Sequence, residues 1–172
     1  MAGLIHLYCG DGKGKTTAAV GLAVRAAGAG KQVIFTQFFK DGSSSEVAAL
    51  RTLPGIRTIH ADTVKGFYRS MTPEQRAKAR EDYTALFRQV TAAAREAELL
   101  ILDEIVSACN RGVVPETLVT DFLRSKPDQL EVVLTGREPS PALMELADYI
   151  TEMRKLRHPY DRGTAARKGI EF

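Results

Sequence analysis

The chain has 172 residues, of which 44% are hydrophobic and 26% are charged. This length corresponds to one domain with a sizeable core, and this composition excludes a disordered chain and a fibre. Lysine and arginine number 24 against 21 aspartates and glutamates, so the net charge is +3. A charge this small does not by itself indicate a nucleic-acid or membrane-surface partner.

The sequence gives no sign of secretion or of a membrane span. Cys9 and Cys109 lie far apart and belong to no metal-ligand spacing. The first residues lack the basic and apolar regions of a signal peptide. No uncharged apolar run approaches the roughly 18 residues that cross a membrane. We therefore expect a cytoplasmic protein with free thiols.

Short apolar runs alternate with longer helical stretches along the chain. Strands are expected over residues 4–9, 33–39, 56–60, 99–102, 130–134 and 149–153. Helices are expected over residues 17–29, from 73 onward, over 115–123 and over 142–147. Continuous apolar strands that alternate with helices indicate an α/β domain, with a mostly parallel sheet covered on both faces.

The helix that begins at Pro73 has the clearest local pattern. Thr72 stands at the N-cap, Pro73 at the first helical position and Gln75 at the position of a capping box. Apolar residues then recur at steps of three and four and form one stripe, at positions 83, 86, 87, 90, 94 and 97.

A glycine- and lysine-rich loop joins the first expected strand to the first expected helix. Its glycines let backbone N–H groups surround phosphate oxygens, and the helix N-terminus adds its positive end. Lys15 can reach those oxygens, and the Thr16 hydroxyl can hold Mg²⁺. The pattern G-x-x-x-x-G-K-[ST] puts Cys9 at its first glycine, so the match is not strict. The expected ATP-binding residues of the loop are Gly10, Asp11, Gly12, Lys13, Gly14, Lys15, Thr16 and Thr17.

Two further strand ends carry charged side chains, and ligands of such sheets bind beyond the carboxyl ends of the strands. Asp103 and Glu104 follow one strand, and carboxylates beside a P-loop hold Mg²⁺ or activate a neighbouring group. Alone this signal is weak, because many buried strands end in aspartate. Arg137 follows the next expected strand and would bind triphosphate, although a solvated turn arginine is an equal alternative.

These residues predict a Mg²⁺-dependent nucleoside triphosphate site on a single-domain, RecA-like P-loop fold over residues 1–172. The fold does not choose among kinases, phosphohydrolases and transferases. A small P-loop kinase or nucleotide phosphohydrolase is therefore one alternative. A nucleotide-binding regulatory or nucleic-acid module is another, but the sequence lacks the basic stripe with interleaved aromatics that such a module needs.

Several segments together resemble the P-loop ATP:corrinoid adenosyltransferases of cobalamin biosynthesis and salvage. That family also lacks glycine at the position of Cys9. The loop and the tail are the most specific parts of a resemblance that spans nearly the whole chain. The matching segments are residues 10–19, 25–31, 37–40, 65–67, 102–104, 134–137, 158–163, Ala166 and 169–172.

The resemblance implies a reaction in which a reduced cob(I) corrinoid attacks the 5′ carbon of ATP. A cobalt–carbon bond forms and inorganic triphosphate leaves, so the protein needs no nucleophile of its own. The implied catalytic residues Lys15, Glu104 and Arg137 would stabilise the leaving group electrostatically. Mg²⁺ (or Mn²⁺) would be held by Thr16, Asp103 and Glu104. Arg25 is placed among the ATP-binding residues.

The resemblance also implies a corrinoid-binding segment, a homodimer and a flavoprotein reductase partner. The corrinoid-binding residues are Phe67, Tyr68 and Arg69. Family members carry a tryptophan two residues after the loop phenylalanine, whereas this chain has Arg69 there and no tryptophan. Tyr68 is the candidate substitute.

The positive charge of the chain is concentrated at its end. Residues 154–172 contain six basic and two acidic residues, so this C-terminal tail carries +4 and the rest of the chain −1. We expect the tail to lie over the nucleotide–corrinoid crevice, where anionic phosphates would meet it. A solvated basic tail is the alternative.

Overall fold

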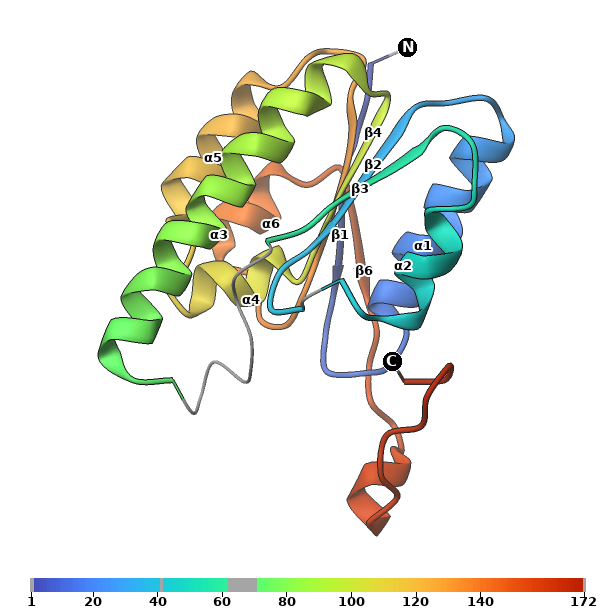
Figure 1. Cartoon of the computed structure of the whole chain (residues 1–172), viewed down its shortest axis with the longest axis vertical. Helices are drawn as coiled ribbons and strands as arrows, with labels where there is room; N and C mark the ends of the chain where they lie inside the picture. Colours follow the sequence, from blue (N-terminus) through green and yellow to red (C-terminus); the bar gives the residue numbers. More distant parts are fainter. Residues whose placement is uncertain (1, 41, 62–70, 172) are drawn as a thin grey trace.

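One parallel sheet organises the computed structural model, which describes residues 2–40, 42–61 and 71–171 (Figure 1). Neighbouring strands all pair in parallel, in the order β3-β2-β4-β5-β1-β6. The predicted parallel α/β architecture is confirmed, and each strand lies within two residues of its predicted ends. The strands are β1 (Ile5–Cys9), β2 (Val33–Gln37), β3 (Ile56–Ile59), β4 (Leu99–Asp103), β5 (Glu131–Thr135) and β6 (Tyr149–Glu152).

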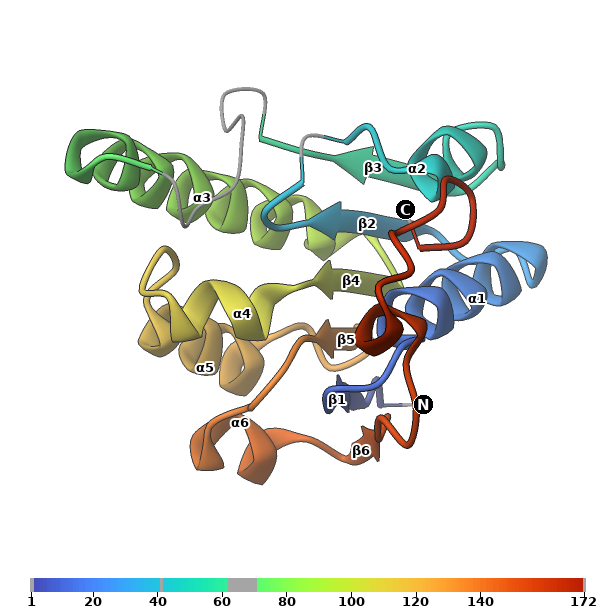
Figure 2. The same ribbon diagram turned by 90° about the horizontal axis from the view of Figure 1, so that it is seen from below.

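Helices cover both faces of the sheet, as predicted (Figures 1 and 2). One face carries α1 (Lys15–Gly28) and α2 (Ser45–Leu50). The other face carries α3 (Pro73–Ala93), α4 (Ile105–Asn110), α5 (Glu116–Ser125) and α6 (Pro141–Leu146). Helices α2 and α4 were not predicted, because six residues are too few to show a full amphipathic repeat. The equally short α6 differs in having a Ser140 side-chain cap and a proline at its start, which α2 and α4 lack.

The two faces of β4 show how the core is filled. Leu99 and Ile101 belong to the apolar cluster beside α1, whereas Leu100 and Leu102 belong to the cluster beside α3 and α5. Every residue of β4 is buried, which explains why the strand has no polar alternation. Small residues on the buried side of α1 let that helix approach the sheet closely; these are Ala19, Ala23 and Ala26.

The capping box predicted at the start of α3 is present. The Thr72 hydroxyl accepts from the Gln75 N–H, and the Gln75 side chain accepts from the Thr72 N–H at 2.9 Å. The apolar stripe of α3 is buried through Val90. The last turn tightens into the 3₁₀ helix η2 (Ala94–Glu96), and Ala94 stays in the core.

The strand order determines where charged residues meet. All carboxyl ends of the strands lie at one edge, because the sheet is parallel. Strand β5 lies between β1 and β4, so it separates the loop after β1 from the carboxylates after β4. Residues at the end of β5 are therefore placed to link the two.

The C-terminal tail leaves the sheet from the edge strand β6 and passes beyond the carboxyl edge (Figures 1 and 2). It contains the short 3₁₀ helix η3 (Pro159–Arg162) and then returns, so that the end of the chain lies near the start of α1. Across the described residues, none of the helices combines the length and apolar character needed to span a membrane.

Gly136, directly after β5, has a φ of +147° and packs tightly against α4. A Cβ at this position would lie 2.7 Å from the Val106 Cβ. We expect Gly136→Ala to lower the free energy of unfolding by about 1–3 kcal/mol. Gly21 is the matched control, because a Cβ there meets nothing within 4 Å. Gly21→Ala, inside α1, should raise the free energy of unfolding by roughly 0.5–1 kcal/mol.

Urea unfolding of the two variants checks this prediction. Equal stability of the two variants would contradict the close packing at Gly136.

Candidate active site

The loop between β1 and α1 is fixed against the end of β6. The Gly12 N–H donates to the Met153 carbonyl at 2.6 Å. A Cβ at Gly12 would lie 2.5 Å from the same carbonyl oxygen, so only glycine allows this approach. The loop is thereby held in a defined shape before any ligand binds.

Lys15 lies inside this loop and is only 7% exposed. Its Nζ donates to the carbonyl oxygens of Gly10 at 2.7 Å and Gly12 at 2.8 Å. Burial lowers the pKa of Lys15; the charge of Glu104 opposes this shift, and that of Arg137 adds to it. Glu104 and Arg137, the other two residues predicted to be catalytic, are thus both close enough to act on Lys15.

Asp103 is the centre of the polar network at the end of β4. Its side chain is fully buried and accepts hydrogen bonds from Thr16 Oγ1 at 2.9 Å, Thr135 Oγ1 at 2.7 Å and Gln37 Nε2 at 3.1 Å. Lys40 Nζ lies 3.7 Å away. Burial raises the pKa of Asp103, while Lys40 and the two threonine hydroxyls oppose that rise. The carboxylate therefore joins β4 to β2, β5 and the phosphate loop.

Glu104 makes a sharp turn between β4 and α4. Its φ of 62° is in the left-handed region, which costs a residue with a side chain about 1–3 kcal/mol. Its N–H donates to Thr135 Oγ1 at 2.9 Å, and its carboxylate accepts from Ser107 Oγ at 2.5 Å. These contacts hold the strained turn and keep the half-buried carboxylate near Lys15.

The oxygen donors around Asp103 fit a magnesium ion that is shared with a nucleotide. Thr16, Asp103 and Glu104 offer one hydroxyl and two carboxylates, the hard ligands that Mg²⁺ combines with substrate phosphates. Within the described part of the chain, no three His, Cys, Asp or Glu side chains gather into a metal-binding cluster. Phosphate oxygens and water would complete the coordination of such an ion.

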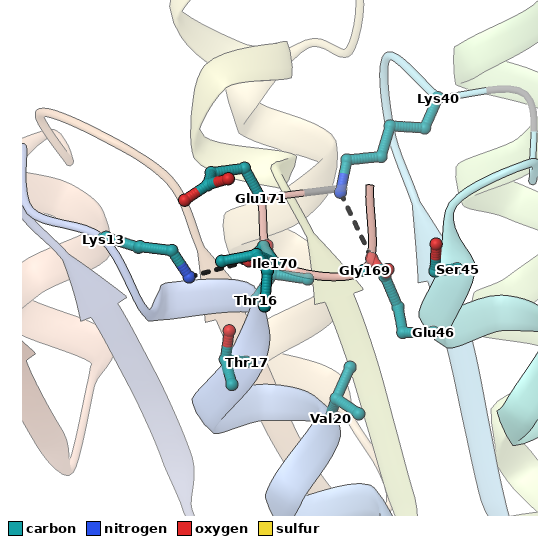
Figure 3. A pocket seen from close by; sticks show the side chains of 10 residues that line it. All are labelled: Lys13, Thr16, Thr17, Val20, Lys40, Ser45, Glu46, Gly169, Ile170 and Glu171. Carbon is teal, nitrogen blue, oxygen red and sulfur yellow. Dashed lines mark hydrogen bonds and ion pairs between the residues drawn. The ribbon is translucent and has the colours of Figure 1, made fainter. Parts of the chain in front are cut away.

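A pocket of about 460 Å³ opens beside the phosphate loop (Figure 3). Its walls come from the loop and α1, from the start of α2 with the segment before it, and from the end of the chain. The lining residues are Lys13, Thr16, Thr17, Val20, Lys40, Ser45, Glu46, Gly169, Ile170 and Glu171.

The C-terminal tail contacts the phosphate loop at two points. Lys13 Nζ donates to the Ile170 carbonyl at 2.9 Å (Figure 3). The Lys155 N–H donates to Asp11 Oδ1 at 2.9 Å, and this hydrogen bond lowers the pKa of Asp11. The end of the tail therefore forms one wall of the pocket.

The other predicted site residues differ in where they lie. Arg25 is exposed in the last turn of α1, about 15 Å along the helix from Lys15. The structure therefore does not bring Arg25 to the phosphate loop, since it lies at the opposite end of α1. Arg137 is exposed after β5, and its charge reaches Lys15 and Asp11. Phe67, Tyr68 and Arg69 lie outside the described residues.

Sequence reasoning missed several polar residues of this network. Gln37 ends β2 and Thr135 ends β5, whereas Lys40 lies between β2 and α2 and Glu46 lies in α2. The signal for Gln37 and Thr135 was a polar residue at the carboxyl end of an otherwise apolar strand, the same signal that indicated Asp103; Lys40 and Glu46 carry no such signal.

The parallel sheet and the loop after β1 are those of the RecA-like P-loop fold class. A KaiC-like protein from Pyrococcus horikoshii has a similar structure, with a TM-score of 0.57 and 16% identity, over 91% of this chain and 75% of that chain. The cytoplasmic domain of the secretion ATPase EccC from Thermomonospora curvata gives a TM-score of 0.54 and 18% identity, over 92% of this chain and 21% of that chain. Likeness at these identities supports the fold alone.

Sequence comparison identifies the family. The family model described as ATP:corrinoid adenosyltransferase BtuR/CobO/CobP matches residues 1–172. A corrinoid adenosyltransferase of Pseudomonas aeruginosa is 32% identical, over 99% of this chain and 84% of its own length. One from Escherichia coli K12 is 33% identical, over 99% and 86%. The chain therefore belongs to the ATP:corrinoid adenosyltransferase family and is a transferase, which confirms the resemblance found in the sequence.

Thr135 links β5 to the end of β4, because its hydroxyl donates to the Asp103 carboxylate and accepts from the Glu104 backbone N–H. Thr135→Val leaves both partners without this bond. We expect the free energy of unfolding to fall by about 1–3 kcal/mol, and Mg²⁺-dependent ATP binding to weaken. Thr120 is the matched control, because it is also buried but bonds only to the Thr117 carbonyl within α5.

Chemical denaturation and calorimetric titration with MgATP measure both effects. Wild-type stability and affinity in Thr135→Val would contradict the linking role, and Thr120→Val should retain MgATP binding.

Proposed function

We propose that this transferase moves the 5′-deoxyadenosyl group of ATP to the cobalt of a reduced cob(I) corrinoid and releases inorganic triphosphate. The observation that carries the proposal is the Lys15 ammonium held within the phosphate loop, beside the Thr16–Asp103 hydrogen bond. In a chain of this family, that arrangement fits an ATP whose triphosphate is bound as a leaving group.

The electron balance of the reaction explains which side chains are needed. Cobalt supplies the electron pair of the new cobalt–carbon bond, and the bond from C5′ to the triphosphate oxygen breaks. The electron pair of that broken bond stays on the triphosphate, so negative charge grows there. Lys15 stabilises this charge from inside the loop, with Lys13 and Arg137 adding positive charge around it.

The proposed metal is Mg²⁺ or Mn²⁺, held by Thr16, Asp103 and Glu104 together with phosphate oxygens. When bound, it supplies positive charge to the triphosphate. The chain's own contribution is to fix the Asp103 carboxylate and the Glu104 backbone through Thr135, and the Glu104 carboxylate through Ser107.

The proposal that the chain binds a corrinoid is based on its membership of the family. We assign corrinoid binding to Phe67, Tyr68 and Arg69. We further propose one domain over residues 1–172, a homodimer and a flavoprotein reductase as partners, and a location in the cytoplasm. Two free cysteines, Cys9 and Cys109, agree with a reducing compartment.

We also propose that the tail, residues 154–172, covers the site. Its contacts with Lys13 and Asp11 support this role, because both residues belong to the phosphate loop. A tail with a charge of +4 complements the anionic groups of both substrates.

Anaerobic incubation with MgATP and cob(I)alamin tests the proposal. We expect the visible spectrum to change to that of a cobalt–carbon corrinoid, with one inorganic triphosphate released for each corrinoid alkylated. Lys15→Ala should lower the rate by at least about 100-fold, while Lys31→Ala should not, because Lys31 is exposed and pairs with Glu98 before β2 begins.

A small kinase or phosphohydrolase would instead yield ADP, with the corrinoid spectrum unchanged, and this product would overturn the proposal. Near-normal turnover of Lys15→Ala at saturating MgATP would remove the role of the loop lysine.

A further inference from the structure

Lys40 adds a further positive charge to the pocket, and it lies outside the phosphate loop. It stands in the segment between β2 and α2, at the carboxyl edge of the sheet. Its Nζ lies 3.4 Å from Glu46 Oε1 and 3.7 Å from Asp103 Oδ2. The side chain is 30% exposed and lines the pocket on the side opposite Lys13 (Figure 3).

Gln37 already holds the two carboxylates that Lys40 approaches. Its Nε2 donates to Glu46 Oε1 at 2.8 Å and to Asp103 Oδ2 at 3.1 Å, and its side chain is fully buried. The carboxylates therefore keep their positions through a short neutral donor. The ammonium of Lys40 contributes charge balance rather than a positioning bond.

The ammonium of Lys40 is held loosely. Charge-assisted N–H···O bonds are about 2.7–2.9 Å long, and both of its separations exceed that range. Of the basic side chains that the structure describes, Lys40 alone lies within 4.0 Å of an Asp103 carboxylate oxygen. An ammonium with three donors and no short bond retains capacity for an anion in the pocket.

We propose that Lys40 binds the triphosphate group of ATP, as a second cation facing Lys15 across the phosphate site; this inference rests on the proposed function. The anion that it takes is a polyphosphate, and the nucleoside is not required. Lys15 contacts the group from the β1–α1 loop, and Lys40 contacts it from the segment after β2. Both charges then act on the leaving triphosphate.

The competing explanation is a structural ion pair between Lys40 and Glu46. Partly buried pairs often contribute little net stability, and removal of one partner leaves the other unbalanced. The two explanations predict different effects of replacing Glu46. If Lys40 binds phosphate, Glu46 competes with the phosphate for the ammonium, whereas in a structural pair both partners matter equally.

Calorimetric titration with inorganic triphosphate, with and without Mg²⁺, separates these explanations. Lys40→Gln should weaken triphosphate binding by at least about tenfold. Glu46→Gln should leave binding unchanged or tighten it, because it removes the competing anion and keeps an acceptor for Gln37. Lys31→Gln is the matched control, since its ion pair with Glu98 also measures 3.4 Å but precedes β2.

Equal weakening by Lys40→Gln and Glu46→Gln, or unchanged binding in Lys40→Gln, would overturn the inference. Lys40→Arg guards against a folding defect, because it keeps the charge and should retain most of the affinity. If Lys40→Arg binds as weakly as Lys40→Gln while both melt like wild type, the inference also fails. This titration does not measure adenosyl transfer. If the proposed function fails, the wild type binds triphosphate but forms no cobalt–carbon bond, and this outcome is distinct from a failure of the inference about Lys40.

Discussion

The structure depends on one buried charge, the carboxylate of Asp103 at the end of β4. A carboxylate without solvent contact is costly unless hydrogen bonds and a cation compensate it. Here the compensation comes from Thr16, Thr135, Gln37 and Lys40. Burial raises the pKa of Asp103 despite these partners. A polar group kept at such cost is typical of a functional site.

The same carboxylate explains how distant parts of the chain form one site. A parallel sheet brings the carboxyl ends of its strands together, but β5 separates β1 from β4. The Thr16–Asp103 hydrogen bond spans that separation, and Thr135 of β5 supports it through its bonds to Asp103 and to the Glu104 N–H. Lys15 comes from the connection after β1 and Lys40 from the connection after β2. In the proposed reaction, the negatively charged leaving group would meet cations from these two separate elements.

Much of this arrangement follows from sequence patterns with a direct physical cause. Apolar runs predict the strands, and the glycine–lysine loop and the end of β4 predict Lys15 and Asp103. The short helices α2 and α4 have too few residues to show a periodic pattern. Arg25 matches a family segment, but its position in the helix expected over residues 17–29 already places it away from the phosphate loop, as the structure shows. Lys40 and Glu46 are joined only by the fold, since neither has a distinctive local pattern.

Replacement of Asp103 by asparagine tests most directly whether the buried charge is needed for MgATP binding or only for stability. The asparagine side chain keeps the shape of the aspartate, and its carbonyl oxygen can still accept from Thr16 and Thr135, but it carries no charge and its NH₂ replaces the oxygen that accepts from Gln37. We therefore expect Asp103→Asn to lower the free energy of unfolding by about 1–3 kcal/mol and to weaken calorimetric ATP binding by at least about tenfold when Mg²⁺ is present. Metal-free ATP binding should not weaken. A variant that loses stability yet binds MgATP like the wild type would contradict this expectation.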